Sequence, residues 1–218
     1  MKGLLLKDFC ISKLQKTFII LIVIMGAVFT YLWKSPSYMV SFLTFIATLF
    51  VLTTISYDEF DNGYSFLFTL PVSRKLYVTE KYVFALLLGA GIWCITTALA
   101  AVYVAVTGAA ELNTDWIMSY IIYLGFVLLI VAVTVPVQLK FGGEKGRIAM
   151  IIVLGGMFLA GWVIVKGLKK IGMDVEAVLD KTSSMGIAVF LGIWFVIFCI
   201  ILFISFGVSV KIMERKEF

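Results

Sequence analysis

The sequence contains no histidine, which is the side chain that most often acts as an acid or base at neutral pH and most often ligates a metal. It has only three cysteines, Cys10, Cys94 and Cys199, which lie far apart, two of them inside apolar runs. Their spacing suggests neither a CxxC metal site nor a disulfide framework, and small packing residues are the favoured interpretation. We therefore expect no metal site, no bound cofactor and no histidine-based catalysis.

Two further absences concern energy supply. The sequence has no Gly-x-x-x-x-Gly-Lys-Ser/Thr motif, and its nearest glycine-rich run, residues 142–147, lacks the spacing and the hydroxyl needed to cradle a phosphate. The middle thirds of the long apolar runs also contain no Asp, Glu, Lys or Arg, whereas ion-coupled carriers need such a group near the midplane. Energy for any transport must therefore come from another protein.

Charge is scarce: 14% of the 218 residues are charged, whereas 62% are hydrophobic. Such a chain cannot cover itself with a hydrated surface, and several of its apolar runs are long enough to cross a bilayer. No polar stretch is long enough for a separate soluble core, so we expect one domain over residues 1–218. The N-terminus lacks the pattern of a cleaved signal peptide, and we expect it to be retained.

The apolar runs predict an all-α, polytopic membrane protein with six transmembrane helices. Residues 1–16 combine apolar side chains with four lysines, which fits either a helix at the membrane interface or a positive tail that only sets topology. Residues 166–186 have apolar positions at helical spacing and are expected to form an external helical insertion. The expected spans are residues 18–33, 38–57, 81–107, 116–138, 148–165 and 187–210.

Some residues within the spans carry expectations of their own. The hydroxyls of Thr48, Thr53, Thr54 and Ser56 are expected to bond back to their own helix, with a strip facing a substrate as the alternative. Pro136 should kink the fourth span or mark its end. The fifth span has an unusually bare face, which would allow close contact with a second copy; its members are Gly155, Gly156, Ala160 and Gly161.

The distribution of positive charge predicts the topology. With both termini in the cytoplasm, 13 of the 18 Lys and Arg residues lie inside, in agreement with the positive-inside rule. The five external cations are balanced by five external carboxylates, so the whole formal charge of +5 lies on the cytoplasmic side. We interpret this excess as a topology signal and a contact with membrane lipids, and we expect no binding to nucleic acid.

Residues 56–81 form the one long polar interruption in the first half of the chain. Its carboxylates Asp58, Glu59 and Asp61 could hold a divalent ion beside a lipid phosphate, as in a membrane-embedded phosphotransferase. Because the sequence lacks the accompanying pattern of acidic residues and arginine on two helices, a solvated charge cluster is the favoured interpretation. Ser73 is placed to cap the helix that leads into the third span.

Glu59, Gly63, the run Phe66-Leu-Phe-Thr-Leu-Pro-Val-Ser-Arg74 and Lys81 resemble the signature of the membrane subunit of ABC-2 type transporters. The run from Pro136 to Arg147 resembles a second, smaller signature of the short bacterial members. The layout of the chain is most similar to the permease subunits of exporters for phenol-soluble modulins and other antimicrobial peptides. This resemblance implies a bacterial plasma-membrane protein that is not itself an enzyme.

The resemblance also implies partners and site residues. A separate ATPase subunit would bind ATP and Mg²⁺, a second permease copy would complete the transporter, and an amphipathic peptide or lipid-like molecule would be exported. Residues 58–70 would form the cytoplasmic coupling segment. Its contacts with the ATPase would be Asp58, Glu59, Phe60, Asp61, Gly63, Tyr64 and Phe66. The turn back to the membrane would comprise Leu70, Pro71, Ser73 and Arg74. A second cytoplasmic loop would present Lys140, Gly142, Glu144, Lys145 and Arg147.

A membrane protein that binds a peptide for immunity or sensing, without transporting it, is the alternative outside the transporter class. It would need no ATPase partner. The lipid phosphotransferase is the alternative within the enzyme class.

Overall fold

The computed structural model describes residues 1–33, 35–60, 63–108, 114–170 and 187–216, and all regular structure in these ranges is helical. The all-α prediction is therefore confirmed. The helices are α1 (Lys2–Leu14), α2 (Lys16–Trp33), α3 (Ser37–Glu59), α4 (Gly63–Leu67), α5 (Arg74–Thr107), α6 (Thr114–Lys170) and α8 (Ile187–Arg215).

Five helical stretches in the described ranges are long and apolar enough to cross a membrane: Ser37–Glu59, Arg74–Thr107, Ser119–Gly143, Ile148–Gly167 and Leu191–Arg215. The helices Lys2–Leu14 and Ile19–Trp33 qualify only as a pair, which is bent by 67°. Counting this pair as one gives six, in agreement with the predicted polytopic architecture. The bend separates the lysine-rich residues 1–16 from the apolar run that follows them, so the two form distinct helices.

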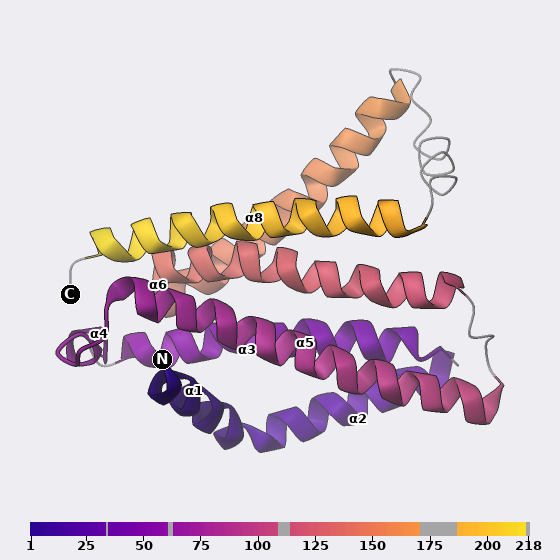
Figure 1. Ribbon diagram of the computed structural model, residues 1–218, viewed down its shortest axis with the longest axis horizontal. Coiled ribbons are helices and arrows are strands. Elements are labelled where there is room, and N and C mark those ends of the chain that lie inside the picture. The colour runs from indigo at the N-terminus through magenta and orange to yellow at the C-terminus, as the bar shows by residue number, and fades with distance from the viewer. Residues whose placement is uncertain (34, 61–62, 109–113, 171–186, 217–218) are drawn as a thin grey trace.

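Figure 1 shows α3, α5, the first half of α6 and α8 running roughly along the bundle, with α1 short and crosswise to them. Both chain termini and α4 lie toward the same end, which we call the α4 end. The core joins α1, α3, α4, α5, α6 and α8, with Ile55, Phe84 and Leu139 among its fully buried members. Arg74 fastens the start of α5 to the last turn of α8 by donating to the carbonyls of Met213 and Glu214.

Three of the α3 hydroxyls named above bond within their own helix, as predicted. Thr48 donates to the carbonyl of Thr44 at 2.8 Å, Thr54 to that of Val51 at 2.9 Å and Ser56 to that of Leu52 at 2.9 Å. These bonds satisfy polar groups inside an apolar helix. Thr48 and Thr54 are fully buried, whereas Thr53 and Ser56 are half-buried and line a pocket, so only the latter two remain open to a substrate.

Pro136 does not end the fourth span as the sequence suggested, because α6 continues helically through it and its backbone leaves the helical region at Gly142. Proline cannot donate the bond that the carbonyl four residues earlier would accept. Here that carbonyl belongs to Ala132, and it accepts a hydrogen bond from the hydroxyl of Ser205 in α8. Ser205 and Ser209 also bond to the hydroxyl of Tyr82, at 2.6 and 2.8 Å, so a polar network offsets the lost bond and joins three helices.

The predicted polar turn at residues 140–147 is also corrected. This stretch is helical apart from Gly142, whose φ of 77° and ψ of −175° interrupt α6 and separate two spans. In Figure 1 the second half of α6, coloured orange, diverges from α8 and projects away from the bundle. The glycines of this half, Gly155, Gly156 and Gly161, have open space where a Cβ would lie. The bare face predicted from the sequence therefore meets no helix of the same chain in the described ranges.

Contact between the fourth span and α8 depends on Gly125, because a Cβ at this position would overlap the ring of Trp194. We expect Gly125→Ala to destabilise the protein by about 1–3 kcal/mol, as overpacking typically does. The measurement is thermal unfolding in detergent, followed by tryptophan fluorescence. Gly91→Ala on α5 is the matched control, since a Cβ there meets nothing within 4 Å. Equal unfolding temperatures for the two variants would contradict this packing.

Candidate functional site

At the α4 end, three helices bring charged side chains together in the protein interior. Lys81 of α5 forms ion pairs with Asp8 of α1 and with Asp58 of α3, the latter at 2.7 Å. Asp8 and Lys81 are completely buried, and Asp58 is 8% exposed. Lys7 also pairs with Asp58 and lies 3.3 Å from Asp8. We call Lys7, Asp8, Asp58 and Lys81 the buried charge cluster.

Neighbouring polar groups complete the cluster. The hydroxyl of Tyr77 donates to Asp58 at 3.1 Å, and Lys81 donates to Thr54 at 3.2 Å. Glu80 lies 3.6 Å from Lys81 and is also fully buried. Burying charges costs several kcal/mol each unless they are paired and hydrogen-bonded. The geometry at Lys81 meets that condition, and it requires α1, α3 and α5 to be in place together.

The sequence of α1 explains why a carboxylate lies on the buried face of this helix. Its buried positions are Leu4, Asp8 and Ser12, which recur every four residues and so lie on one face. The opposite side exposes apolar side chains, including Leu6 and Leu14 at 68% and 79%. Because its buried face carries Asp8 as well as Leu4, α1 is held by ion pairs as well as by packing.

A second set of contacts starts at Glu59, the last residue of α3. Its carboxylate accepts the backbone N–H of Gly143 at 2.6 Å and the ammonium of Lys216 at 3.2 Å. Lys216 also donates to the carbonyl of Leu139 at 3.3 Å. Glu59 therefore fixes the end of α3 against the break in α6 and against the residue that follows α8. We call these contacts the Glu59 junction.

Aromatic side chains lie on the surface of the segment between Glu59 and the start of α5. Phe60 is 72% exposed and Phe66, on α4, is 71% exposed. Tyr64 points inward from the same helix, packs edge-on against Tyr77 with ring centroids 5.8 Å apart, and is 4% exposed. Burial raises the pKa of the Tyr64 hydroxyl, which keeps it neutral. The packing of Tyr64 against Tyr77 thus holds the segment on the protein, while the rings of Phe60 and Phe66 face outward.

The predicted turn residues lead from α4 into α5. Leu70 and Pro71 are exposed, and the N–H of Val72 bonds to the carbonyl of Leu70 in a tight turn. The hydroxyl of Ser73 accepts the N–H of Leu76 at 3.1 Å, which confirms Ser73 as the cap of α5. Helix α5 therefore starts at Arg74, seven residues before the predicted start of the third span.

The structure brings together most of the predicted ATPase-contact residues but gives them different environments. Phe60 and Phe66 are exposed, Gly63 and Glu59 are half-buried, and Asp58 and Tyr64 are buried. Asp61 lies outside the described residues, as do residues 171–186 of the predicted external insertion. In the second predicted loop Lys140 and Lys145 are exposed and Gly142 is buried, while the side chains of Glu144 and Arg147 are not described. The assignment of these residues to an ATPase contact stays a prediction.

The expectation of a solvated cluster at Asp58, Glu59 and Asp61 is wrong for Asp58, whose two carboxylate oxygens face Lys7, Lys81 and Tyr77. Sequence reasoning also missed the pairing of Asp8 with Lys81. A signal for it was present, because Asp8 is the one carboxylate in an otherwise apolar and basic segment. Its partner, 73 residues away along the chain, could not be chosen from spacing.

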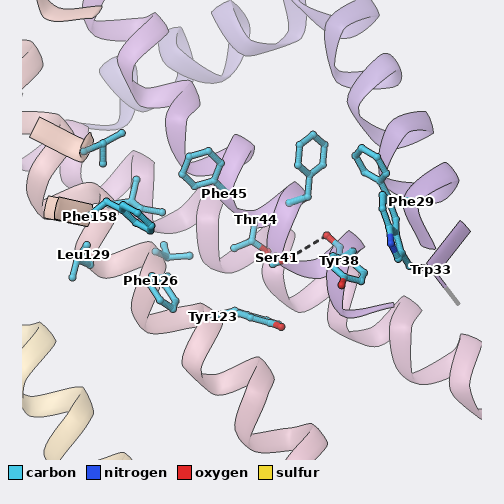
Figure 2. A pocket seen from close by; sticks show the side chains of 14 residues that line it. Phe29, Trp33, Tyr38, Ser41, Thr44, Phe45, Tyr123, Phe126, Leu129 and Phe158 are labelled. Atoms are coloured by element: carbon cyan, nitrogen blue, oxygen red, sulfur yellow. Dashed lines mark hydrogen bonds between the residues drawn. The ribbon is translucent and has the colours of Figure 1, made fainter. Parts of the chain in front are cut away.

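A separate apolar pocket of about 810 Å³ lies between α2, α3 and both halves of α6. Figure 2 shows aromatic rings around it, including Phe29 and Trp33 from α2, Phe45 from α3 and Phe126 from α6. Polar groups are few, and Ser41 turns its hydroxyl back to the carbonyls of Ser37 and Tyr38 at 2.9 and 3.2 Å. Such a pocket suits an apolar chain or ring.

The membrane-length helices define a multi-pass membrane protein, and the anchored polar segment exposes Phe60 and Phe66 at its α4 end. A sequence model described as ABC-2 family transporter protein matches residues 3–214. The chain belongs to this family and is the membrane component of an ABC transporter, which implies association with an ABC ATPase. No curated protein and no solved structure matches it.

Replacing Lys81 tests the buried charge cluster. Lys81→Met would leave Asp8 without its main cation in the interior, and removing one partner of a buried pair costs about 3–5 kcal/mol. We expect a lower unfolding temperature and faster proteolysis within residues 1–16, because α1 loses its anchor. Lys75→Met is the control, since Lys75 lies on the same helix as Lys81 but its side chain is exposed. Protection of α1 equal to that of the unmodified protein would disprove the anchoring role.

The Glu59 junction gives a second prediction at neighbouring glycines. At Gly142 a Cβ would overlap the carboxylate of Glu59, and the φ of 77° is unfavourable for alanine by about 1–2 kcal/mol. Gly142→Ala should therefore lower the unfolding temperature in detergent. Gly143→Ala should be tolerated, because its nearest neighbour is the Ser56 hydroxyl at 3.5 Å. The reverse order of stability would contradict the geometry of the junction.

Proposed function

We propose that this chain is the permease subunit of an ATP-driven exporter that moves amphipathic peptides or lipid-like antimicrobial molecules out of a bacterial cell. A separate ATPase supplies the energy. The observation that carries the proposal is the pair of exposed rings, Phe60 and Phe66, on a segment that the buried charge cluster and the Glu59 junction hold in place. Large exposed aromatics are the side chains that most often anchor a protein interface.

The anchoring supports a role in transmission. A partner that pulls on Phe60 and Phe66 acts on Asp58 and Glu59, which lie directly before them in the chain. Through Asp58 the displacement reaches α1 and α5, and through Glu59 it reaches the break in α6 and the end of α8. ATP binding and hydrolysis in the partner would thereby shift several spans together between two arrangements.

A second permease copy completes the proposed transporter. The second half of α6 projects from the bundle, exposes Ile151, Phe158 and Trp162, and leaves its glycines open. Small residues on such a face allow the close helix approach that drives association within a membrane. A partner copy on this face would also border the apolar pocket, since Leu154 and Phe158 belong to its lining.

The pocket supports the substrate class. Its lining is almost entirely apolar and aromatic, so it favours a molecule with a large hydrophobic part over a sugar or an ion. This chain would serve transport and not catalysis. Both carboxylates of the alternative phosphotransferase site that the structure describes, Asp58 and Glu59, are engaged by lysines or by a backbone N–H.

Truncating Phe66 tests the docking surface. Phe66→Ala should weaken co-purification with the ATPase by thirtyfold or more, since loss of an interface anchor costs about 2 kcal/mol or more. Stimulated ATPase activity in vesicles should fall in parallel, and Phe60→Ala should act in the same direction. Phe203→Ala is the matched control, because Phe203 is 76% exposed on α8, within a membrane-length stretch.

Unfolding temperatures of all three variants should remain within a few degrees of the unmodified protein. Unchanged ATPase binding in both Phe60→Ala and Phe66→Ala would refute the docking surface. Peptide tolerance in cells that lack every ATPase partner would instead support the immunity or sensor alternative.

A further inference from the structure

A cleft of about 610 Å³ opens at the α4 end, between the last turns of the fourth span and of α8. The side chains of both walls change from apolar to basic along the helices. Apolar side chains line the part nearer the middle of the helices, and basic side chains line the mouth. The lining residues are Pro136, Val137, Leu139, Lys140, Phe141, Val208, Ile212, Arg215 and Lys216.

Three cations meet at the mouth of this cleft, one from α6 and two from the end of α8. Lys216 is already bonded to Glu59 and to the carbonyl of Leu139. Lys140 and Arg215 are exposed, and no carboxylate among the side chains that the structure describes lies within 4.0 Å of either ammonium or guanidinium group. The Lys140 ammonium lies 5.3 Å from the centroid of the Phe141 ring. Among the described side chains, Lys140 and Arg215 thus offer an anion two cations on facing helices that have no carboxylate partner.

The apolar wall continues onto the outer side of the bundle. Phe141 is 43% exposed and Val208 is 47% exposed, and both belong to helical stretches long enough to cross a membrane. The cleft thus changes from apolar to cationic where these stretches end. Acyl chains followed by a phosphate headgroup have the same order of properties.

We propose that this cleft binds an anionic phospholipid, with the phosphate between Lys140 and Arg215 and an acyl chain along Val137 and Val208. A free phosphate would leave the apolar wall in water, and an acidic protein surface would not fill it, whereas a lipid satisfies both parts. The proposal does not depend on the export function. The cleft does border the Glu59 junction, because Lys216 lines the cleft and also donates to Glu59. The Lys216 ammonium lies over the ring of Tyr64 as well, 4.9 Å from its centroid.

The test compares lipid binding by the full chain and two double variants. Lys140→Gln with Arg215→Gln removes both available cations, and Lys75→Gln with Lys211→Gln removes two exposed cations that do not line the cleft. Each protein is delipidated in detergent and titrated with phosphatidylglycerol or phosphatidylcholine. Bound lipid is counted by native mass spectrometry, and the unfolding temperature is recorded.

We expect phosphatidylglycerol to bind and to raise the unfolding temperature of the unmodified protein and of the Lys75/Lys211 variant. The Lys140/Arg215 variant should bind it on the order of thirtyfold more weakly, given the usual contribution of each cation near anionic lipid. Lys140→Arg with Arg215→Lys keeps both charges and should retain binding. Because it changes the same two positions, this variant also shows whether a loss of binding follows from the lost charge or from substitution at these positions.

Four outcomes would overturn the proposal. They are equal binding of phosphatidylcholine, equal losses in the two Gln variants, full competition by glycerol 3-phosphate or inorganic phosphate, and loss of phosphatidylglycerol binding in the charge-exchanged variant despite an unchanged fold. The proposal also fails if the Lys140/Arg215 variant still binds phosphatidylglycerol but no longer binds the ATPase in detergent without added lipid. The cleft would then be a protein-binding surface. Failure of the Phe66 experiment leaves these results unaffected.

Discussion

Lys81 lies in the interior between two carboxylates that come from different helices, and much of the α4 end depends on that position. A buried ammonium is tolerated only where opposite charge and hydrogen-bond acceptors surround it. Asp8 of α1 and the α3 residues Asp58 and Thr54 provide these groups. The ion pairs therefore demand that α1, α3 and α5 meet in one arrangement, and they hold α1 although its outward face is apolar.

The same contacts fix a short helix, α4, at this end of the bundle. Five residues of α4 make a helix too short to be stable alone. They are held by Tyr64, which packs inward, and by Asp58 and Glu59 just before them. Asp58 ties the start of this segment to α1 and α5, and Glu59 ties it to the break in α6 and to the residue after α8.

Polar groups within the apolar bundle follow one rule: each described break in backbone bonding has a compensating partner. The carbonyl freed by Pro136 is satisfied by Ser205, and the N–H exposed by the break at Gly142 is satisfied by Glu59. In an apolar environment, an unsatisfied group would cost several kcal/mol. Backbone conformation, and not the presence of a partner, distinguishes the two positions. The proline is compensated and the helix continues, whereas the glycine adopts a positive φ and the helix turns.

The sequence by itself determined the all-helical membrane class, the positions of the long apolar runs, the cap at Ser73 and the back-bonding of the α3 hydroxyls. These features depend on neighbours within a few residues, so composition and spacing are enough to predict them. Only the tertiary structure decided that Asp58 is buried, that Lys81 pairs with Asp8, and that α6 breaks at Gly142 and not at Pro136. Each of these depends on a side chain many residues away, which becomes a partner only when helices pack.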